Sequence, residues 1–273
     1  MNEKLSAVQA AVLENMKLFD RICQENGLRY FATGGTGLGM VRHKGFIPWD
    51  DDADLSMPRA DFEKLKTVTL PEGFILKERP EYLKSMNFIN THKKIRSKLR
   101  EEADNHDFEF VSVDIFPMDG APDNKFKRTL HVYKWLYYLL MIKFSEIDKV
   151  VERNQLLKKN RKKKEAFLIK VGVFLKPVLH LDREKLEEKF YRHITKYDYD
   201  KSSYVACYIG RYRQKEIVPI ECFGKGKRVP FEDMMIMSPD KPEIYLSSIY
   251  GDFMKLPPEN QRESHNFDDV EDC

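Results

Sequence analysis

Four aspartates stand within five positions, at 50–52 and at 54, where a loop leads into a short apolar run. Such a set of carboxylates constrains the fold, because like charges repel each other and resist being buried together. If residues 53–57 form a strand, side chains two positions apart point the same way. Asp52 and Asp54 then share one face, while Ala53 and Leu55 point into the core.

A metal ion would relieve this repulsion. A hard divalent cation takes oxygen ligands, and Mg²⁺ is the usual choice beside phosphates, with Mn²⁺ as the alternative. The other interpretation is a solvated acidic turn. Asp114 is a lone acid in the apolar run 111–116, and an unpaired buried acid is costly. We expect the metal site to be its partner, with a cap or salt bridge as the alternative and Asp119 as the second candidate.

Glycines precede the aspartates. Gly34, Gly35, Gly37 and Gly39 follow a strand candidate at 28–32, and a short helix is expected to begin there. Glycine lets the backbone approach a ligand closely, and free N–H groups at a helix start favour phosphate. Glycine-rich turns alone are weak indicators, but together with the aspartates they favour a metal and phosphate site.

The pattern along the chain predicts an α+β protein. Helices are expected at 5–25, with Gly27 as the C-terminal cap, and at 59–68, 182–196 and 241–250; further strands are expected at 88–89 and 111–116. A basic helical region runs from 125 to about 180. We therefore expect one catalytic domain over 1–273, with a helical insertion at about 125–197. A net charge of +3 and 42% hydrophobic residues indicate a folded chain without a general affinity for nucleic acid.

These motifs resemble the LicD family, a branch of the polymerase-β-like nucleotidyltransferase superfamily. The matching segments are 34–36, 41–54, 113–119 and 250–259. The most specific of them contains the run Arg42-His43-Lys44-Gly45-Phe46-Ile47-Pro48-Trp49-Asp50-Asp51-Asp52. One departure is Ala53, which stands where a larger aliphatic residue is common.

The resemblance implies a polymerase-β-like nucleotidyltransferase fold, with a mixed sheet flanked by helices. It also implies a bacterial phosphotransferase that decorates cell-surface glycans, typically moving phosphocholine from CDP-choline. Carried over to this sequence, Asp52, Asp54 and Asp114 become the metal ligands and catalytic acids. In the mechanism expected here, Asp114 also takes the proton of the acceptor hydroxyl.

Donor binding is expected at the glycine loop and at nearby basic residues, since Arg suits bidentate phosphate contacts. The candidates are Gly34, Gly35, Thr36, Arg42, Lys94 and Arg96. For Lys94 and Arg96 an exposed strand face is the equal alternative. His43 is expected to make a structural hydrogen bond, with proton transfer as the alternative. Trp49, Tyr30 and Phe46 could form an aromatic box for a quaternary ammonium, although such aromatics more often belong to a core.

The predicted function is Mg²⁺-dependent transfer of phosphocholine, or a related phospho-group, from a CDP-activated donor to a hydroxyl of a cell-surface glycan or teichoic acid precursor. The alternative enzyme leaves a nucleoside monophosphate on the acceptor. A non-catalytic RNA-binding module using the basic helices is the third hypothesis, but three acids in the ligand face would repel RNA, so no nucleic acid partner is expected.

The region 125–164 is either a solvated basic face or a contact with an anionic membrane. Its densest charge run is 161–164, and large apolar residues such as Trp135 and Tyr137 accompany the charge. A lipid-linked glycan acceptor would make such a contact useful. Four cysteines without a C-x-x-C pair and the lack of an N-terminal apolar run predict a cytoplasmic protein, peripheral on the inner face of the cell membrane.

Overall fold

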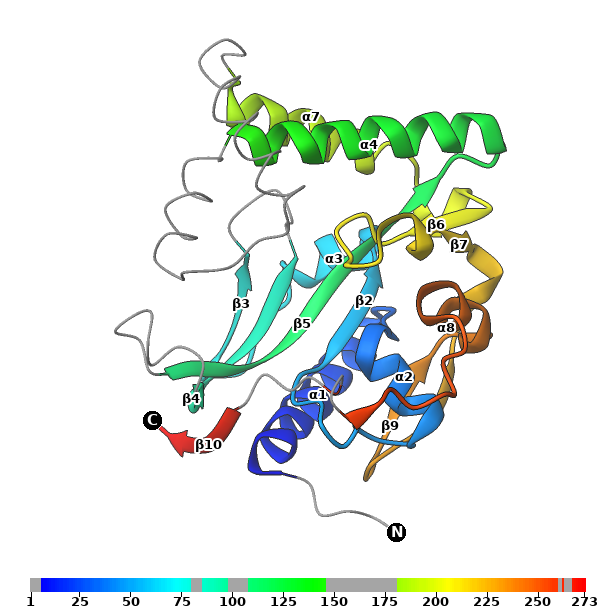
Figure 1. Ribbon diagram of the computed structural model, residues 1–273. Helices are drawn as coiled ribbons and strands as arrows, with labels where there is room; N and C mark the ends of the chain where they lie inside the picture. The colour runs from blue at the N-terminus through cyan, green and yellow to red at the C-terminus, as the bar shows by residue number, and fades with distance from the viewer. Residues whose placement is uncertain (1–5, 80–84, 98–107, 146–180, 260–261, 263–266) are drawn as a thin grey trace. The chain divides into compact units, whose positions relative to one another are not determined.

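The computed structural model describes residues 6–79, 85–97, 108–145, 181–259, 262 and 267–273 (Figure 1). The chain divides into two compact units, Met1–Asp123 with Tyr197–Cys273, and Asn124–Lys196. The first unit contains a mixed sheet with helices, which confirms the predicted α+β class. The expectation of one catalytic domain with a helical insertion at about 125–197 stays a prediction.

The main sheet has eight strands in the part of the chain that is described, and its central path runs β1–β2–β5–β4–β10. These strands are β1 (Phe31–Ala32), β2 (Asp54–Pro58), β5 (Phe108–Ala121), β4 (Met86–Ser97) and β10 (Phe267–Asp272). β3 (Phe74–Glu78) pairs with β4, β6 (Tyr204–Ala206) pairs with β5, and β7 (Val218–Pro219) pairs with β6. β2 and β5 run parallel, while the other pairs are antiparallel.

The register of the parallel pair places two candidate residues side by side. Asp54 is the partner of Asp114, and Leu55 is the partner of Ile115. Ala53 and Leu55 are each 1% exposed, which confirms that they point into the core. Because β2 begins at Asp54, Asp52 lies in the loop before the strand rather than on it.

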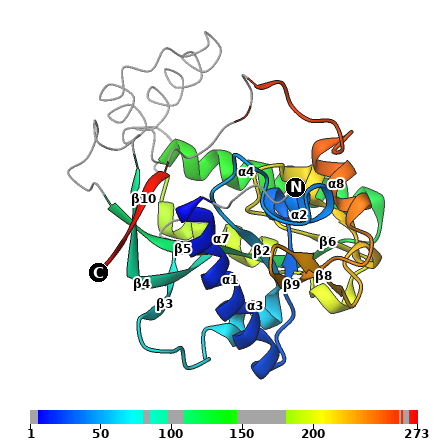
Figure 2. The same ribbon diagram turned by 90° about the horizontal axis from the view of Figure 1, so that it is seen from below.

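The helix α1 (Ala7–Asn26) packs against β4 and β5 (Figure 2). It starts with a capping box, in which Ser6 and Gln9 satisfy each other's backbone N–H groups. It ends at Gly27, whose φ of 60° lies in the left-handed region, so the expected cap is confirmed. Its apolar face, which includes Val12, Met16 and Phe19, lies in the main core. The short helix α3 (Arg59–Leu65) follows β2 directly.

A second apolar cluster positions the other helices of this unit. It packs α2 (Gly34–Arg42) against α8 (Pro242–Tyr250), with Leu38 and Leu246 among the buried contacts. Around it lie the 3₁₀ segments η1 (Tyr199–Lys201), η2 (Arg213–Glu216) and η3 (Ile220–Cys222). A hairpin of β8 (Lys227–Phe231) and β9 (Met234–Ser238) contributes Phe231 and Ile236 to the main core.

The second unit is described through two helices that pack on each other, α4 (Lys125–Ser145) and α7 (Arg183–Ile194). Trp135, Ile142 and Phe190 are at most 1% exposed. The rings of His131 and His193 stack with centroids 3.8 Å apart. The predicted helical stretch 146–180, with its lysine run, lies outside the described residues. Among the described helices, none is both long enough and apolar enough to cross a membrane.

Candidate functional site

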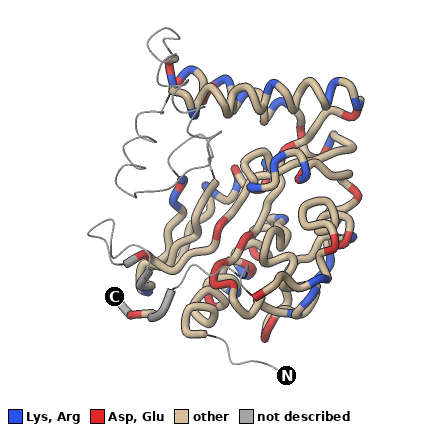
Figure 3. Tube along the Cα trace, viewed as in Figure 1, with Lys and Arg blue, Asp and Glu red and all other residues tan. Residues whose placement is uncertain are grey.

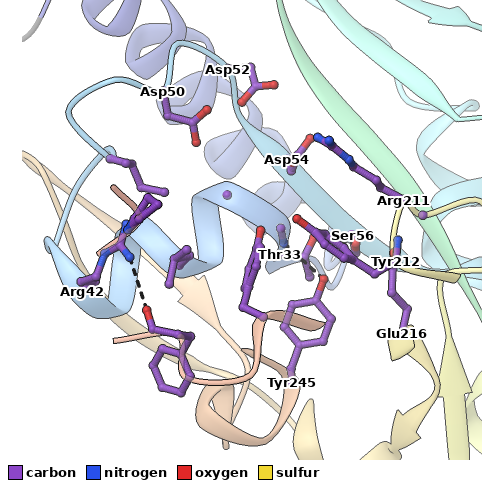
Figure 4. Close-up of a pocket in the computed structure, with 18 of the residues that line it drawn as sticks. Thr33, Arg42, Asp50, Asp52, Asp54, Ser56, Arg211, Tyr212, Glu216 and Tyr245 are labelled. Carbon is purple, nitrogen blue, oxygen red and sulfur yellow. Dashed lines mark hydrogen bonds between the residues drawn. The ribbon is translucent and has the colours of Figure 1, made fainter. Parts of the chain in front are cut away.

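A pocket of about 640 Å³ opens beside the start of α2 (Figure 4). Its volume falls in the range of ordinary small-molecule sites. The predicted residues that line it are Gly34, Gly35, Arg42, Trp49, Asp52 and Asp54. Further polar or charged lining residues are Thr33, Asp50, Ser56, Arg211, Tyr212, Glu216, Tyr245, Tyr250, Asp252 and Lys255. Three basic side chains thus face five acidic ones around a single cavity.

The start of α2 is fixed to β2. Thr33 is the N-cap in an extended conformation and makes no capping bond with its side chain. The backbone N–H of Gly34 donates to the Tyr245 hydroxyl at 3.2 Å, and that of Gly35 donates to the Asp54 carboxylate. The Thr36 hydroxyl accepts from the Asp54 backbone N–H at 2.8 Å. Thr36 therefore holds the strand against the helix and does not line the pocket.

The two glycines make room for carboxylates. A Cβ on Gly34 would lie 2.6 Å from Oδ2 of Asp54, and a Cβ on Gly35 would lie 2.5 Å from Oδ2 of Asp50. Gly34 also has a φ of 54°, which side chains rarely adopt. The partial positive charge of a helix N-terminus favours anions there. In this structure the anions at the glycine pair are the two aspartates.

The aspartates influence one another strongly. Burial raises the pKa of Asp54 well above its usual value, and the charges of Asp52, Asp114 and Asp50 raise it further, while the Gly35 N–H opposes the shift. Such a group is stabilised either by taking up a proton or by a nearby cation. The site is therefore built to receive positive charge.

The donor set has the chemistry that a hard divalent cation prefers, because it consists of carboxylates whose charges influence one another. Asp54 and Asp52 both line the pocket and would hold such an ion. Asp114 stands beside Asp54 in register but does not line the pocket. Within the described residues, no three His, Cys, Asp or Glu side chains are grouped closely enough to hold a metal. The three-ligand set stays a prediction.

Asp114 has its own partners. Its Oδ2 accepts from Arg79 Nη2 at 2.7 Å, and its Oδ1 accepts from the side-chain amide of Asn87. The alternative acid, Asp119, is buried and accepts two bonds from Arg59, at 2.7 and 2.9 Å. That pair ties β5 to α3. Asp119 thus has a structural role as a buried salt-bridge partner.

The basic candidates separate into two groups. Arg42 lines the pocket, donates to the carbonyl oxygen of Phe253 at 3.3 Å, and donates to Nε2 of His43 at 2.9 Å. Lys94 does not line the pocket; its Nζ lies 5.9 Å from the centre of the Phe110 ring. Arg96 is on β4, and its side chain is outside the described part of the structure. The structure therefore brings Arg42, but not Lys94, to the aspartates.

The aromatic candidates divide in the same way. Trp49 lines the pocket, where the Arg262 guanidinium lies 4.6 Å from the centre of its ring. Tyr30 is in the core and donates to Oδ1 of Asp20 at 2.6 Å. Phe46 packs on Phe231, also in the core. For Tyr30 and Phe46 the core interpretation is the one that holds.

Residues far along the chain complete the pocket, and sequence reasoning missed them. Figure 4 shows Arg211 pointing toward Asp54 from the opposite wall. Glu216 is buried, accepts from the Tyr212 backbone N–H at 2.9 Å, and has its pKa raised by burial to about 7. The motif 250–258 supplies a further wall. Two features of the sequence could have pointed to this part of the pocket. One is that C-terminal motif, which had no assigned role, and the other is the segment 210–212 after β6, which contains an arginine and a tyrosine. His265 lies outside the described residues.

The fold and pocket define an α+β protein whose site gathers carboxylates at a glycine-rich helix start. Residues 27–147 match the family model described as LicD/FKTN/FKRP, nucleotidyltransferase domain. Over 270 residues the chain is 26% identical to the lipopolysaccharide cholinephosphotransferase LicD of Haemophilus influenzae, and the match covers 96% of each chain. An uncharacterized protein of Rickettsia prowazekii is 39% identical over 57 residues, or 21% of each chain.

The resemblance to the LicD family is thereby confirmed, and the chain carries a LicD-family domain over residues 27–147. That segment contains the glycine pair, the three candidate ligands Asp52, Asp54 and Asp114, and the pocket residue Asp50. The walls contributed by residues 207–258 lie beyond it.

Proposed function

We propose that this protein is a phosphotransferase with a polymerase-β-like nucleotidyltransferase fold, which moves phosphocholine, or a related phospho-group, from a CDP-activated donor to a hydroxyl of a cell-surface glycan precursor. The main observation in support of this proposal is the pocket in which Asp50, Asp52 and Asp54 gather at the start of α2. The relative from Haemophilus influenzae, matched over almost its whole length, is named a lipopolysaccharide cholinephosphotransferase. This name supports phosphocholine as the group that is transferred.

The basic side chains of the pocket would hold the donor's diphosphate. Arg42 and Arg211 can each form paired hydrogen bonds with phosphate oxygens, and Lys255 adds a point charge. A divalent cation held by Asp54 and Asp52, with Asp114 as the predicted third ligand, would supply stabilisation of the negative charge on the phosphates. The donor's phosphates would thus neutralise the basic side chains of the pocket, and the cation would neutralise its aspartates.

The chemical step would need a base and an aligned acceptor. Asp114 would take the proton of the acceptor hydroxyl on an oxygen that already accepts a hydrogen bond from Arg79 or Asn87. The acceptor oxygen would form a bond to the phosphorus distal to the nucleoside. The bond from that phosphorus to the bridging oxygen would break, and CMP would leave. Holding both substrates in one cavity would contribute much of the acceleration.

The pocket also suits a choline head group. Trp49, Tyr212, Tyr250 and Phe253 line it together with the acids Asp252 and Glu216. Aromatic faces attract a quaternary ammonium through cation–π contacts worth about 0.5–2 kcal/mol each. A cation already lies on one such face, since Arg262 stacks over Trp49.

A second candidate is nucleotidyl transfer, which is favoured because the matched family model is that of a nucleotidyltransferase domain. Both reactions can use the same carboxylates, so product analysis must separate them. The protein would be incubated with Mg²⁺, an acceptor glycan extract and a panel of CDP- and UDP-linked donors. Release of CMP from CDP-choline, with choline label on the glycan, is the expected result. Label from the nucleoside on the acceptor, with release of phosphocholine from CDP-choline, would favour the second candidate instead.

A further inference from the structure

The helix α4 carries a row of exposed apolar side chains. Their positions advance by four and three residues alternately, which keeps them on one side of a helix. The five side chains are between 46% and 71% exposed. They are Phe126, Leu130, Tyr133, Tyr137 and Leu140. His131, Trp135 and Ile142 are buried, and α7 packs against this helix. The exposed row, called here the α4 stripe, is therefore separate from the face that forms the core of this unit.

The charge of α4 has one sign. The helix has five lysine and arginine residues and no aspartate or glutamate over its 21 residues. Its basic residues are Lys125, Lys127, Arg128, Lys134 and Lys143, and Figure 3 shows them spread along the helix. A solvated helix face ordinarily mixes both signs and avoids such a row of apolar residues. A partner that fits this helix must offer both an apolar region for the α4 stripe and negative charge for the basic residues.

A second copy of the chain fits this face poorly. Two α4 helices placed stripe to stripe would bring ten positive charges together without an acidic residue of either helix to balance them. Three of the five stripe residues are aromatic, and tyrosine has an apolar ring with a polar tip. Such side chains gather at the boundary between lipid headgroups and acyl chains.

We propose that α4 lies flat on an anionic bilayer, with the α4 stripe at the acyl boundary and its lysines among the lipid phosphates. The stripe extends over about 20 Å along the helix axis, from the rise of an α-helix. The inference stands on the described face of α4 and does not rest on the proposed function. It narrows the sequence expectation, which placed the contact over the whole basic region 125–164, to one exposed face of α4.

Vesicle binding tests this assignment without donor, acceptor or turnover, so its outcome is independent of the catalytic proposal. The whole protein would be co-sedimented with vesicles of phosphatidylcholine alone and of phosphatidylcholine with phosphatidylglycerol, at low and at high salt. We expect binding only to the anionic vesicles, weakened by salt because screening shortens the reach of surface charges.

Two pairs of variants identify the face. Leu130→Ser with Tyr137→Ser should weaken partition into anionic vesicles by at least about tenfold, since apolar area no longer inserts. The matched control, Ile75→Ser with Met235→Ser, removes apolar residues that are 46% and 43% exposed in the other unit and should bind as the parent does. Lys127→Gln with Lys134→Gln should reduce the preference for anionic lipid, while Lys201→Gln with Lys225→Gln should not. Circular dichroism would check that each variant keeps its helix content.

Three outcomes would overturn the assignment. The parent protein could fail to sediment with anionic vesicles at low salt, or the stripe variant could bind as well as the parent. Alternatively, light scattering could show a concentration-dependent dimer that the stripe variant abolishes, without any vesicle binding. In that last case the α4 stripe would be a contact between two copies of the chain.

Discussion

Asp54 and Asp114 stand side by side on parallel strands, but their carboxylates have different surroundings. Asp54 borders the pocket and accepts a bond from the first turn of α2. Asp114 is held by Arg79 and Asn87. This difference suits a division of roles, in which Asp54 is primarily a cation ligand and Asp114 is the group that takes the proton.

Replacing Asp114 with asparagine tests that division. The variant keeps the shape of the side chain and one oxygen acceptor, but it cannot take a proton. We expect the turnover number to fall by about 10²–10⁴-fold, the usual effect of losing a general base. The dissociation constant of CDP-choline with Mg²⁺ should change little. CMP release would measure the rate, and calorimetry would measure binding.

Asn87→Ala is the matched control, because it removes a partner of Asp114 but leaves the carboxylate, and it should cost less activity than Asp114→Asn. Loss of donor binding in Asp114→Asn would show that Asp114 is mainly a metal ligand. Full activity in that variant would show that Asp114 is a structural acid, and His43 would be the next candidate base.

Glu216 predicts a pH dependence of stability. Burial raises its pKa from 4.5 to about 7, so the folded protein holds this proton more tightly than the unfolded chain does. The stabilisation is fully present below pH 4.5 and is lost as pH rises toward 7, by at most about 3 kcal/mol. Glu216→Gln keeps the acceptor for the Tyr212 N–H and should therefore raise Tm at pH 8 but not at pH 4.5. Equal differences in Tm at both pH values would refute this account.

Among the elements, those set by local signals were predictable. The end of α1 at Gly27 and the start of α7 after Asp182 follow from capping residues, and the core positions Ala53 and Leu55 follow from strand alternation. The strand expected at 28–32 shrinks to Phe31–Ala32, because only these two residues find partners on β2. The length of a strand depends on the partner strand to which it is hydrogen-bonded. The sequence of one segment does not show where that partner strand ends.

The packing of α4 on α7 predicts sensitivity to acid. Burial and the nearby His193 lower the pKa of His131 from 6.5 to about 3, and the pKa of His193 is lowered as well. The unfolded chain therefore binds protons between pH 6.5 and 3 that the folded protein does not. Stability should be full above pH 6.5 and should fall below it, and His131 alone contributes at most about 2 kcal/mol of this loss at pH 5.

The variant His131→Phe keeps an aromatic ring in the packed face but removes its titration. Its Tm should fall less than that of the parent between pH 7 and pH 5, as followed by circular dichroism. A matched control is His92→Phe, an exposed histidine on β4, which should leave the parent's pH profile unchanged. A parallel fall in Tm for the parent and His131→Phe would contradict the role given to this ring.

At the scale of the whole molecule, one half of the site was predictable and the other half was not. The glycine pair and the aspartates are close in sequence, so strand and helix periodicity placed them together. Arg211, Glu216 and the 250–258 wall reach the same pocket across more than 150 residues, and no local pattern reports such a contact. Lys94 was expected at the pocket but does not line it. Alternation along a strand predicts the face on which a side chain lies, but it does not predict which end of the sheet holds the site.

We propose that the aspartates at the start of α2 bind a nucleotide donor together with a divalent cation. Calorimetric titration of CDP-choline into the whole protein, with and without Mg²⁺, tests it most directly. The variants are Asp54→Asn, which removes a pocket carboxylate, and Asp233→Asn, an exposed acid paired with Lys17 away from the pocket.

We expect the parent and Asp233→Asn to bind CDP-choline only when Mg²⁺ is present, and Asp54→Asn to lose that Mg²⁺-dependent binding while keeping the parent's circular dichroism spectrum. Binding of equal strength with and without Mg²⁺ in all three proteins would contradict the claim, as would an absence of binding in the parent under either condition.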